Sequence, residues 1–292
     1  MTFETALTQL MGGLTVGMVL FLTAVGLSIM FGTLKVLNLA HGGLFMLGAY
    51  LCFWITSKLS GVIGSFWWSL LLAPLFVAFF GGIVEIFLLR RLYAREFLDQ
   101  FLLTFALILI IEDLCKLAWG PDFRMVATPG ILDGGIKISG TLFPKYNIFI
   151  IFCGPAVFLS LWSLIHYTRL GKMIRAVTFN REIANALGVN VSLIYTTVFM
   201  LGCWLAGLGG VLMAPMGAVR PGMDHIILID CFIIVVIGGL GSLPGALLGS
   251  IILGLINAFG ILIVPKIAIA FGFILMLVIL IIRPWGLLGK PE

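Results

Sequence analysis

Charged residues are scarce in this sequence of 292 residues, and their scarcity excludes a soluble fold. Asp, Glu, Lys and Arg make up 10% of the chain, whereas hydrophobic residues make up 62%. A soluble domain carries about 25% charged and about 45–50% apolar residues, so this composition cannot supply a surface that faces water. Helices satisfy every backbone N–H internally, which lipid requires. The sequence therefore predicts an all-α polytopic membrane protein.

Catalytic and nucleotide-binding motifs are missing as well. The sequence contains no H-E-x-x-H, G-x-S-x-G or G-x-x-x-x-G-K-[ST] pattern. Its three histidines, His41, His166 and His225, lie in different segments, and no nucleophile is paired with a base. We therefore expect no catalytic residues, no metal site and no P-loop ATP site in this chain. An intramembrane enzyme is the least favoured hypothesis.

Two further absences concern cysteine pairs and the N-terminus. The cysteines show no C-x-x-C spacing, and we interpret them as small buried hydrophobes rather than as a disulfide or metal framework. No Lys or Arg precedes Lys35, so the N-terminal segment lacks the basic flank of a cleaved signal peptide and is expected to be a retained first span. The five cysteines are Cys52, Cys115, Cys153, Cys203 and Cys231.

Long apolar runs dominate the chain. A helix needs about 20 apolar residues to cross a hydrocarbon core of about 30 Å. Several of the segments are short or interrupted by glycine, so we expect about eight spans, between seven and nine, in a single transmembrane domain over residues 1–292. Residues 226–264 fit two short crossings or one hairpin that dips into the membrane and returns. The apolar segments are 10–31, 39–54, 65–89, 101–119, 148–166, 192–215, 225–240, 246–264 and 267–282.

The distribution of basic residues predicts the orientation. Ten of the 17 Lys and Arg residues, including the dense clusters in 90–95 and 169–181 and the C-terminal Lys290, fall on one side of the predicted spans. Cytoplasmic loops carry the excess of Lys and Arg, so the loop 168–190 and the C-terminus are placed in the cytoplasm and the N-terminus outside. The loop 119–146 is then external. It is either a solvated connector or a surface on which an external partner lands.

Ionisable residues inside the predicted spans are few. Glu112 and Lys116 are spaced i,i+4 at the end of a span and are expected to pair, and Glu85 is expected to pair with Arg90 or Arg91. No chain of acids suggests a proton relay, which weakens the hypothesis of a proton-coupled transporter. The full set is Glu85, Glu112, Asp113, Lys116 and Asp230.

Glycine is abundant, with 36 residues, and it recurs at four-residue spacing. Small residues at this spacing let membrane helices approach closely. They indicate either plain packing or helices that slide during transport. The sets are Gly13 and Gly17, then Ala206 and Gly210, then Gly241, Gly245 and Gly249.

Two stretches place polar residues or glycines at membrane depth, and they are candidates for a translocation path. Residues 32–50 and residues 236–249 fit broken helices that line a path, and they also fit tight structural turns. Pro244 adds a helix-breaking residue to the second stretch. The candidate path residues are Asn38, His41, Gly42, Gly43, Gly238, Gly239 and Gly241.

The loop 168–190 is the largest charged element. Its apolar residues recur at helical spacing from Met173 to Leu187, which predicts one short helix that Gly188 ends. This helix can lie on the membrane surface, or it can insert into a groove of a cytoplasmic partner. Without a P-loop or a proton relay, the chain must take its energy from outside, which favours docking. The charged residues are Arg169, Lys172, Arg175, Arg181 and Glu182.

Several stretches resemble a known transporter family. The patterns G-x-x-x-R-A, from Gly171 to Ala176, and A-x-x-x-G, from Ala184 to Gly188, resemble the cytoplasmic loop of permease subunits of bacterial ABC importers. VLNLAHGGLFMLGAY, WGPDFRMV and VIGGLGSLPGALLGSIILG resemble the branched-chain amino acid (LIV-type) permeases, and the likeness is closest to the shorter of that system's two permease subunits.

This resemblance implies a subunit of an ATP-driven importer in the bacterial inner membrane. Its implied partners are a second homologous permease subunit, two cytoplasmic ABC ATPases that hold the ATP and Mg²⁺, and a periplasmic substrate-binding protein. No cofactor on this chain and no nucleic-acid partner are expected. The resemblance also implies that a short coupling helix docks on the ATPase. Its implied residues are Gly171, Lys172, Arg175, Ala176, Arg181, Glu182, Ala184 and Gly188.

The substrate stays open at this stage. Leu39 and Gly43 depart from the family pattern, in which a phenylalanine and an acid or serine are expected. The family carries leucine-like amino acids, and its relatives carry other amino acids, amides or urea. The alternative from a different class is a stand-alone secondary transporter or channel for a small polar solute.

Overall fold

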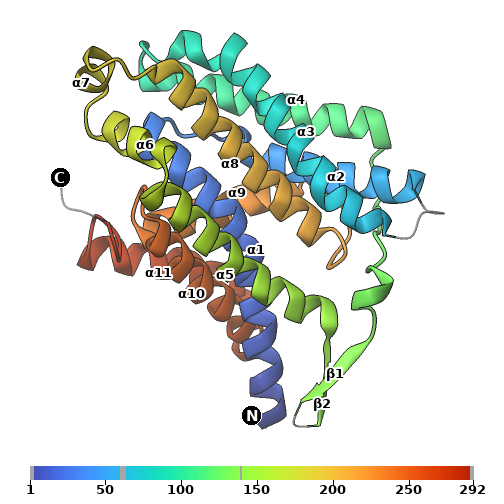
Figure 1. Ribbon diagram of the computed structural model, residues 1–292. Coiled ribbons are helices and arrows are strands. Elements are labelled where there is room, and N and C mark those ends of the chain that lie inside the picture. The colour runs from blue at the N-terminus through green and yellow to red at the C-terminus, as the bar shows by residue number, and fades with distance from the viewer. Residues whose placement is uncertain (1–2, 60–63, 139, 290–292) are drawn as a thin grey trace.

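The computed structural model describes residues 3–59, 64–138 and 140–289, so Lys290 lies outside the described residues. Helices make up most of this part of the chain, as the composition predicts (Figure 1). The α-helices are α1 (Phe3–Leu34), α2 (Ala40–Lys58), α3 (Ser65–Phe87), α4 (Phe97–Trp119), α5 (Lys145–Tyr167), α6 (Arg169–Phe179), α7 (Arg181–Ala186), α8 (Val191–Met213), α9 (Met223–Gly238), α10 (Leu243–Ile263) and α11 (Ala268–Ile282).

Each predicted apolar segment corresponds to one of these helices. Five of them, α1, α3, α5, α8 and α10, are long and apolar enough to cross a membrane by length and composition. Of the others, α9 and α11 are shorter, with 16 and 15 residues, and α2 and α4 include charged residues. The chain is an all-α polytopic membrane protein, and the number of crossings stays a prediction.

Helix α1 is the centre of the packing, and α5, α8, α9 and α10 pack against it (Figure 1). It has 32 residues, and those from Gly17 to Met30 are buried. Its glycines allow close contact with α10, because a Cβ atom at Gly17 would lie 2.8 Å from the carbonyl oxygen of Ser250. The predicted packing role of the Gly13 and Gly17 pair is therefore confirmed.

A second layer consists of α2, α3, α4 and α8. A Cβ at Gly48 of α2 would lie 2.6 Å from the carbonyl oxygen of Gly207 in α8, so these two backbones touch. Gly210 approaches the Phe45 carbonyl in the same way. Gly210, of the predicted pair Ala206 and Gly210, thus lies in a helix contact, and Gly48 and Gly207 add a close approach outside the four-residue pattern.

Helices α9 and α10 form an antiparallel pair joined by the turn at residues 239–242. Helix α9 begins inside the bundle rather than at its edge, because the carbonyl of Asp224 in its first turn packs against Gly42 of α2. This internal start explains why α9 is short. Residues 226–264 are thus two packed helices.

The loop between α4 and α5 contains a small hairpin that the turn signals did not predict. Strands β1 (Gly135–Ile138) and β2 (Thr141–Pro144) pair antiparallel, with Gly135 opposite Pro144. Earlier in the loop, Arg124 exchanges two backbone hydrogen bonds with Val219, at 2.9 and 2.8 Å. This pairing holds the loop against the connector that links α8 to α9.

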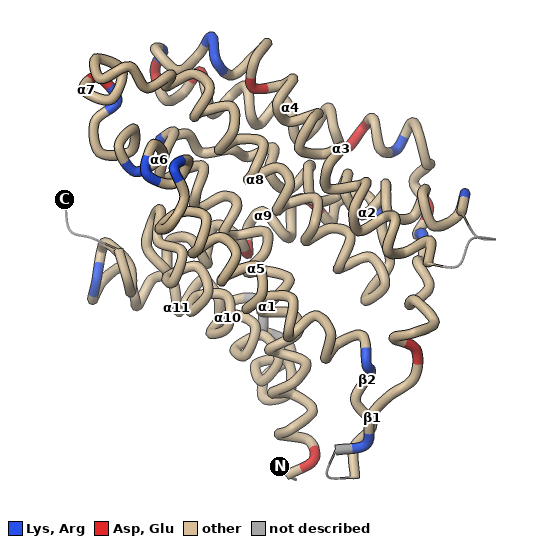
Figure 2. The backbone as a smooth tube through the Cα atoms, viewed as in Figure 1, with Lys and Arg blue, Asp and Glu red and all other residues tan. Residues whose placement is uncertain are grey.

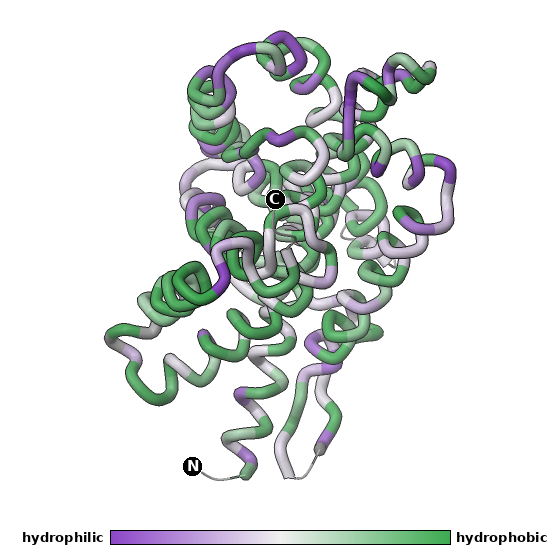
Figure 3. The backbone as a smooth tube through the Cα atoms, turned by 90° about the vertical axis from the view of Figure 1, so that its left-hand side faces the viewer, coloured by the Kyte–Doolittle hydropathy of each residue, from purple (hydrophilic) through white to green (hydrophobic). Residues whose placement is uncertain are grey.

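The bundle has two distinct ends. The start of α1 lies beside the hairpin, whereas α6 and α7 lie at the opposite end of the bundle (Figure 1). Lys and Arg residues gather on α6 (Figure 2), and hydrophobic residues fill the long helices between the two ends (Figure 3). The segment after α11 joins α6 at the same end, since Leu287 and Leu288 donate to carbonyls at the end of α9.

Candidate functional site

Helix α6 is fixed to the end of α5 by a tight turn. The Thr168 hydroxyl caps α6 by accepting a hydrogen bond from the Gly171 N–H at 3.1 Å. Gly171 packs so closely on the carbonyls of Leu164 and Ile165 that no side chain fits there. Arg175 donates from its guanidinium to the same Ile165 carbonyl. Gly171 therefore shapes the turn, and Arg175 ties α6 to it.

The prediction of one continuous helix up to Gly188 is wrong. Asn180 adopts an extended backbone with φ −156°, which separates α6 from α7. Its side-chain oxygen accepts hydrogen bonds from the N–H groups of Glu182 and Ile183, both at 3.0 Å. An asparagine at this position satisfies two free donors of a new helix and so favours a second start over continuation.

Gly188 ends α7, as predicted. Its φ of +84° lies in the left-handed region, where glycine carries no Cβ penalty. The Val189 N–H then reaches back to the Ala184 carbonyl at 3.0 Å and closes the end of the helix. Open space surrounds Gly188, because a Cβ atom there would have no described neighbour within 4 Å.

Large apolar side chains of the α6–α7 segment face away from the rest of the chain. Phe179 is 92% exposed, Leu187 is 79% exposed and Ile183 is 56% exposed. The apolar stripe predicted from Met173 to Leu187 is thus divided, because Val177 is buried and Ile183 is not. We call Phe179, Arg181, Ile183 and Leu187 the docking surface.

The predicted coupling residues fall into two groups. Gly171 and Ala184 are buried and hold the two short helices against the bundle. The other members are exposed at the same end of the molecule and are available to a partner. They are Lys172, Arg175, Ala176, Arg181, Glu182 and Gly188.

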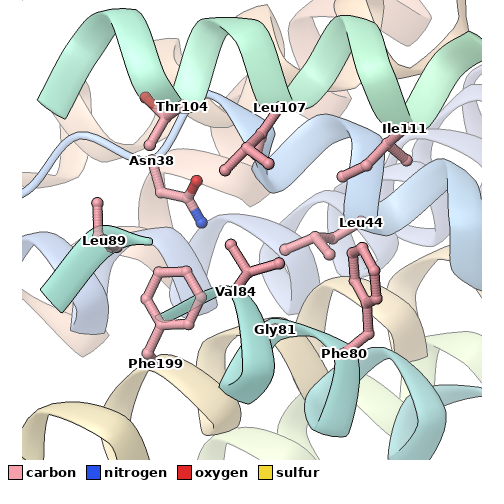
Figure 4. A pocket seen from close by; sticks show the side chains of 11 residues that line it. Asn38, Leu44, Phe80, Gly81, Val84, Leu89, Thr104, Leu107, Ile111 and Phe199 are labelled. Atoms are coloured by element: carbon pink, nitrogen blue, oxygen red, sulfur yellow. The ribbon is translucent and has the colours of Figure 1, made fainter. Parts of the chain in front are cut away.

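Asn38 lines a small closed space between α2, α3, α4 and α8. Figure 4 shows its amide among the apolar side chains of Leu44, Val84 and Phe199. Its Nδ2 donates weakly to the Met30 sulfur at 3.7 Å, and its Oδ1 is buried without a partner among the described residues. The cavity has a volume of about 10 Å³, room for about one water molecule. An amino acid does not fit there in this conformation.

The neighbouring candidates are packed between helices. The His41 ring is fully buried, and its Nε2 lies 2.8 Å from the Thr23 carbonyl oxygen of α1. Gly42 packs on the Asp224 backbone of α9, and a Cβ at Gly43 would meet Ile111 of α4 at 3.3 Å. These three residues join α2 to three other helices.

The second candidate stretch lies at the end of the bundle that carries α6. Gly238 packs on Gly245, and Gly239 packs on Gly289 and the Trp285 carbonyl. A Cβ at Gly241 would lie 3.0 Å from the Cα of Gly32, next to the end of α1. The structure therefore places the two candidate stretches in separate contacts, and their role in a path stays a prediction.

Comparison with known proteins identifies the family. Residues 9–282 match the model of the family described as "Branched-chain amino acid transport system / permease component". The chain belongs to this family. It is 31% identical to the high-affinity branched-chain amino acid transport system permease protein BraD of Pseudomonas aeruginosa, over 98% of this chain and 96% of the relative.

Other relatives agree with this assignment. The permease is 27% identical to the LivH permease protein of the high-affinity branched-chain amino acid transport system of Escherichia coli, over 98% of this chain and 96% of the relative. It is also 27% identical to the probable branched-chain amino acid transport permease protein LivH of Methanocaldococcus jannaschii, over 95% of this chain and 91% of the relative. No solved structure matches the chain.

The permease holds a polar cluster near the start of α8. Arg90 forms a salt bridge with the fully buried Glu85 at 3.0 Å, as predicted. The Thr196 hydroxyl donates to the same carboxylate at 2.8 Å, and the Tyr93 hydroxyl donates at 3.2 Å. One carboxylate thus joins α3, the turn after it, and α8. The other predicted pair, Glu112 and Lys116, is also confirmed, at 3.0 Å.

We expect Glu85→Ala to destabilise the permease. The variant removes the hydrogen bonds that the buried carboxylate accepts from Arg90, Tyr93 and Thr196, and because the Arg90 left behind is partly exposed, a loss of about 3 kcal/mol is expected. Thermal unfolding of the detergent-purified permease measures the effect. The comparison variant is Thr196→Val, which removes the hydroxyl that donates to Glu85 and accepts from Arg90, and each lost hydrogen bond is expected to cost about 1 kcal/mol. Equal melting temperatures for Glu85→Ala and the natural protein would contradict the role of the cluster.

Two features of the docking end have little signal in the sequence. The periodicity of 173–187 assigns Asn180 to a polar position of one helix, although an asparagine followed by Arg-Glu-Ile is a typical helix start. The sequence pattern does not predict that Phe179 is exposed, because a single apolar residue has no periodicity. Its exposure follows from the break at Asn180, which turns the end of α6 outward.

Proposed function

We propose that this permease is the transmembrane subunit of an ATP-driven importer that carries branched-chain or related small amino acids across the inner membrane of a bacterium. The observation that carries the proposal is the family match over residues 9–282, joined to the exposed docking surface. The curated relatives are permease proteins of branched-chain amino acid transport systems. In this proposal the chain is not an enzyme, and it binds no cofactor.

The partners follow from the same proposal. ATP and Mg²⁺ are held by two cytoplasmic ABC ATPases, a second homologous permease completes the pathway, and a periplasmic binding protein delivers the solute. The docking surface supports the ATPase contact, because exposed aromatic and aliphatic side chains beside basic residues are typical of helix-in-groove recognition. The end with α6 then faces the cytoplasm, and the N-terminus lies outside.

Reconstitution tests the proposed function. The chain is co-expressed with the proposed second permease and ATPases and placed in liposomes with ATP inside. The binding protein and labelled L-leucine are supplied outside. We expect leucine accumulation that depends on ATP, and no ATP hydrolysis by the chain alone. Leucine transport by proteoliposomes that hold this chain alone would instead favour a stand-alone transporter or channel.

Gly188→Trp is expected to reduce ATP-driven uptake at least tenfold while the permease still inserts and folds. A Cβ at Gly188 has no described neighbour within 4 Å, so the new side chain starts in open space and the loss is expected to arise at the partner. Arg175→Glu, which reverses a charge on the same element, is expected to act in the same direction.

Gly188→Ala is the matched control for this variant. It imposes the same left-handed strain, about 1–2 kcal/mol, without the bulk of an indole. If Gly188→Ala and Gly188→Trp reduce uptake equally, the effect is local strain rather than docking. Normal uptake by Gly188→Trp would exclude this end of α7 from the ATPase contact.

A further inference from the structure

A larger cavity lies between the middle of α1, the first half of α9 and the external loop, away from the docking surface. It has a volume of about 340 Å³, within the usual range of about 300–1,000 Å³ for small-molecule pockets. It is partly open, and α1, α2, α8, α9, the external loop and the connector between α8 and α9 line it. Its lining is Val16, Val19, Leu20, Phe45, Phe123, Met213, Ala214, Gly217, Ala218, Arg220, Met223, Ile226, Ile227 and Asp230.

Two opposite charges line this otherwise apolar cavity. Arg220 belongs to the connector, and Asp230 lies seven residues into α9 from Met223. The Arg220 guanidinium lies over the Phe123 ring, 5.6 Å from its centroid, which holds the charge at the cavity wall. Neither side chain forms a hydrogen bond or an ion pair within the described residues, with each other or with a third group.

An unpaired carboxylate inside a membrane helix is unusual. Charge at membrane depth is expensive, and ionisable residues there pair with each other or serve a substrate path. Glu85 and Glu112 both have a basic partner. Asp224, in the first turn of α9, is buried without a hydrogen bond to its carboxylate among the described residues, but the His225 ring lies 3.9 Å away and Asp224 does not line this cavity. Asp230 is therefore a carboxylate that a ligand can satisfy.

We propose that this cavity binds an α-amino acid as its zwitterion, with Arg220 holding the carboxylate and Asp230 holding the ammonium group. A zwitterion supplies both missing counter-charges and brings no net charge into the cavity. Arg220 can take the carboxylate in a bidentate contact. The inference rests on the proposed function and extends it to a substrate-binding site within this chain.

The rest of the lining selects the side chain of that amino acid. Val16, Leu20, Met213, Ile226 and Ile227 present aliphatic surface to the cavity. Removal of a branched aliphatic side chain from water is favourable there, whereas a charged or amide side chain would lose its hydration without gaining a partner. The cavity thus fits leucine, isoleucine or valine better than a polar amino acid.

A second cavity lies along the same two helices. It has a volume of about 860 Å³, and its wall includes Phe31 and Lys35 near the end of α1 and Val236 and Leu240 near the end of α9. The same two helices therefore border both cavities, at different positions along their length. The zwitterion site is the outer of the two, and Gly241, a candidate path residue, lines the inner one.

Substrate protection of an introduced cysteine tests the site. Ala218→Cys places a thiol in the cavity wall, and its alkylation by N-ethylmaleimide is followed in the purified complex with and without L-leucine. Ala127→Cys is the matched control, because Ala127 lines a different cavity, of about 560 Å³, beside the external loop. We expect leucine to slow alkylation at position 218 at least fivefold and to leave position 127 unchanged.

Two fragments of leucine test the need for both charges. 4-Methylpentanoate lacks the amino group, and 3-methylbutylamine lacks the carboxylate, so neither is expected to protect the thiol at leucine concentrations that do. Asp230→Asn and Arg220→Gln are each expected to raise the leucine concentration for half-protection at least tenfold. Protection by either fragment as good as that by leucine would show an apolar or lipid-like site and overturn the proposal.

The outcomes separate this inference from the proposed function. Absence of ATP-driven leucine uptake by the natural complex would overturn the proposed function itself. Normal uptake by the natural complex together with an unprotected thiol at position 218, or with protection unchanged in both charge variants, would overturn only this site. Gel filtration of Asp230→Asn, which keeps the shape of the side chain, confirms that a loss of protection is not a loss of fold.

Discussion

Phe179→Asp is expected to weaken the complex with the ATPase about 30-fold or more and to abolish most ATP-driven uptake. Phe179 is 92% exposed at the end of α6, so the side chain has little to stabilise within its own chain. Loss of a buried aromatic anchor from an interface typically weakens the binding free energy by about 2 kcal/mol or more, which raises the dissociation constant about 30-fold. A carboxylate in the same groove adds the cost of burying a charge.

Two measurements distinguish a docking defect from a folding defect. The affinity of the purified ATPase for the permease in nanodiscs gives the binding loss directly, and the melting temperature of the permease alone is expected to stay unchanged. Phe179→Leu is the control variant, because it keeps an apolar side chain and is expected to lose less than Phe179→Asp. An unchanged affinity for Phe179→Asp would remove Phe179 from the docking surface.

Gly48→Leu is expected to prevent recovery of folded permease. A Cβ at this position would lie 2.6 Å from the Gly207 carbonyl oxygen and 2.7 Å from the Gly207 Cα, and both are backbone atoms that no rotamer change can move. Overpacking a core costs about 1–3 kcal/mol even where side chains can adjust, and α2 and α8 cannot adjust without separating. A further cost of this size is a large part of a total stability of about 5–15 kcal/mol.

Gly12→Leu is the matched control for this second variant. Gly12 also lies within a long apolar helix, but a Cβ there has nothing within 4 Å. Fluorescence-detected gel filtration of membrane extracts compares the two. We expect a sharp folded peak for Gly12→Leu and aggregated or absent material for Gly48→Leu. Comparable peaks for both would show that the α2–α8 contact tolerates a side chain.

The sequence was sufficient for much of the fold because lipid allows few alternatives. Each apolar run became a helix, and the short-range pairs Glu85 with Arg90 and Glu112 with Lys116 were predictable from spacing alone. Gly188 ends its helix for a local reason as well, since only its own backbone conformation is involved. Local rules are reliable where the residues that interact are close in sequence.

Contacts between distant segments were not predictable in the same way. A membrane helix is apolar on every face, so its composition does not reveal that Leu44 is buried whereas Leu71 is exposed. The break at Asn180 depends on a cap that competes with helix continuation, and propensity alone does not decide this competition. The placement of Arg220 and Asp230 around one cavity requires the connector to fold back over α9, which only the tertiary structure shows.

Helix α1 runs without a break from one end of the bundle to the other. With 32 residues it is about 48 Å long, and its side chains contribute to the outer cavity through Val16 and Leu20. Near its other end, the Thr33 hydroxyl accepts a hydrogen bond from Thr178 of α6 at 3.4 Å. In the proposed importer, a displacement of α6 by the ATPase is therefore transmitted along α1 to the wall of the amino acid site, over about 26 Å and without any intermediate element.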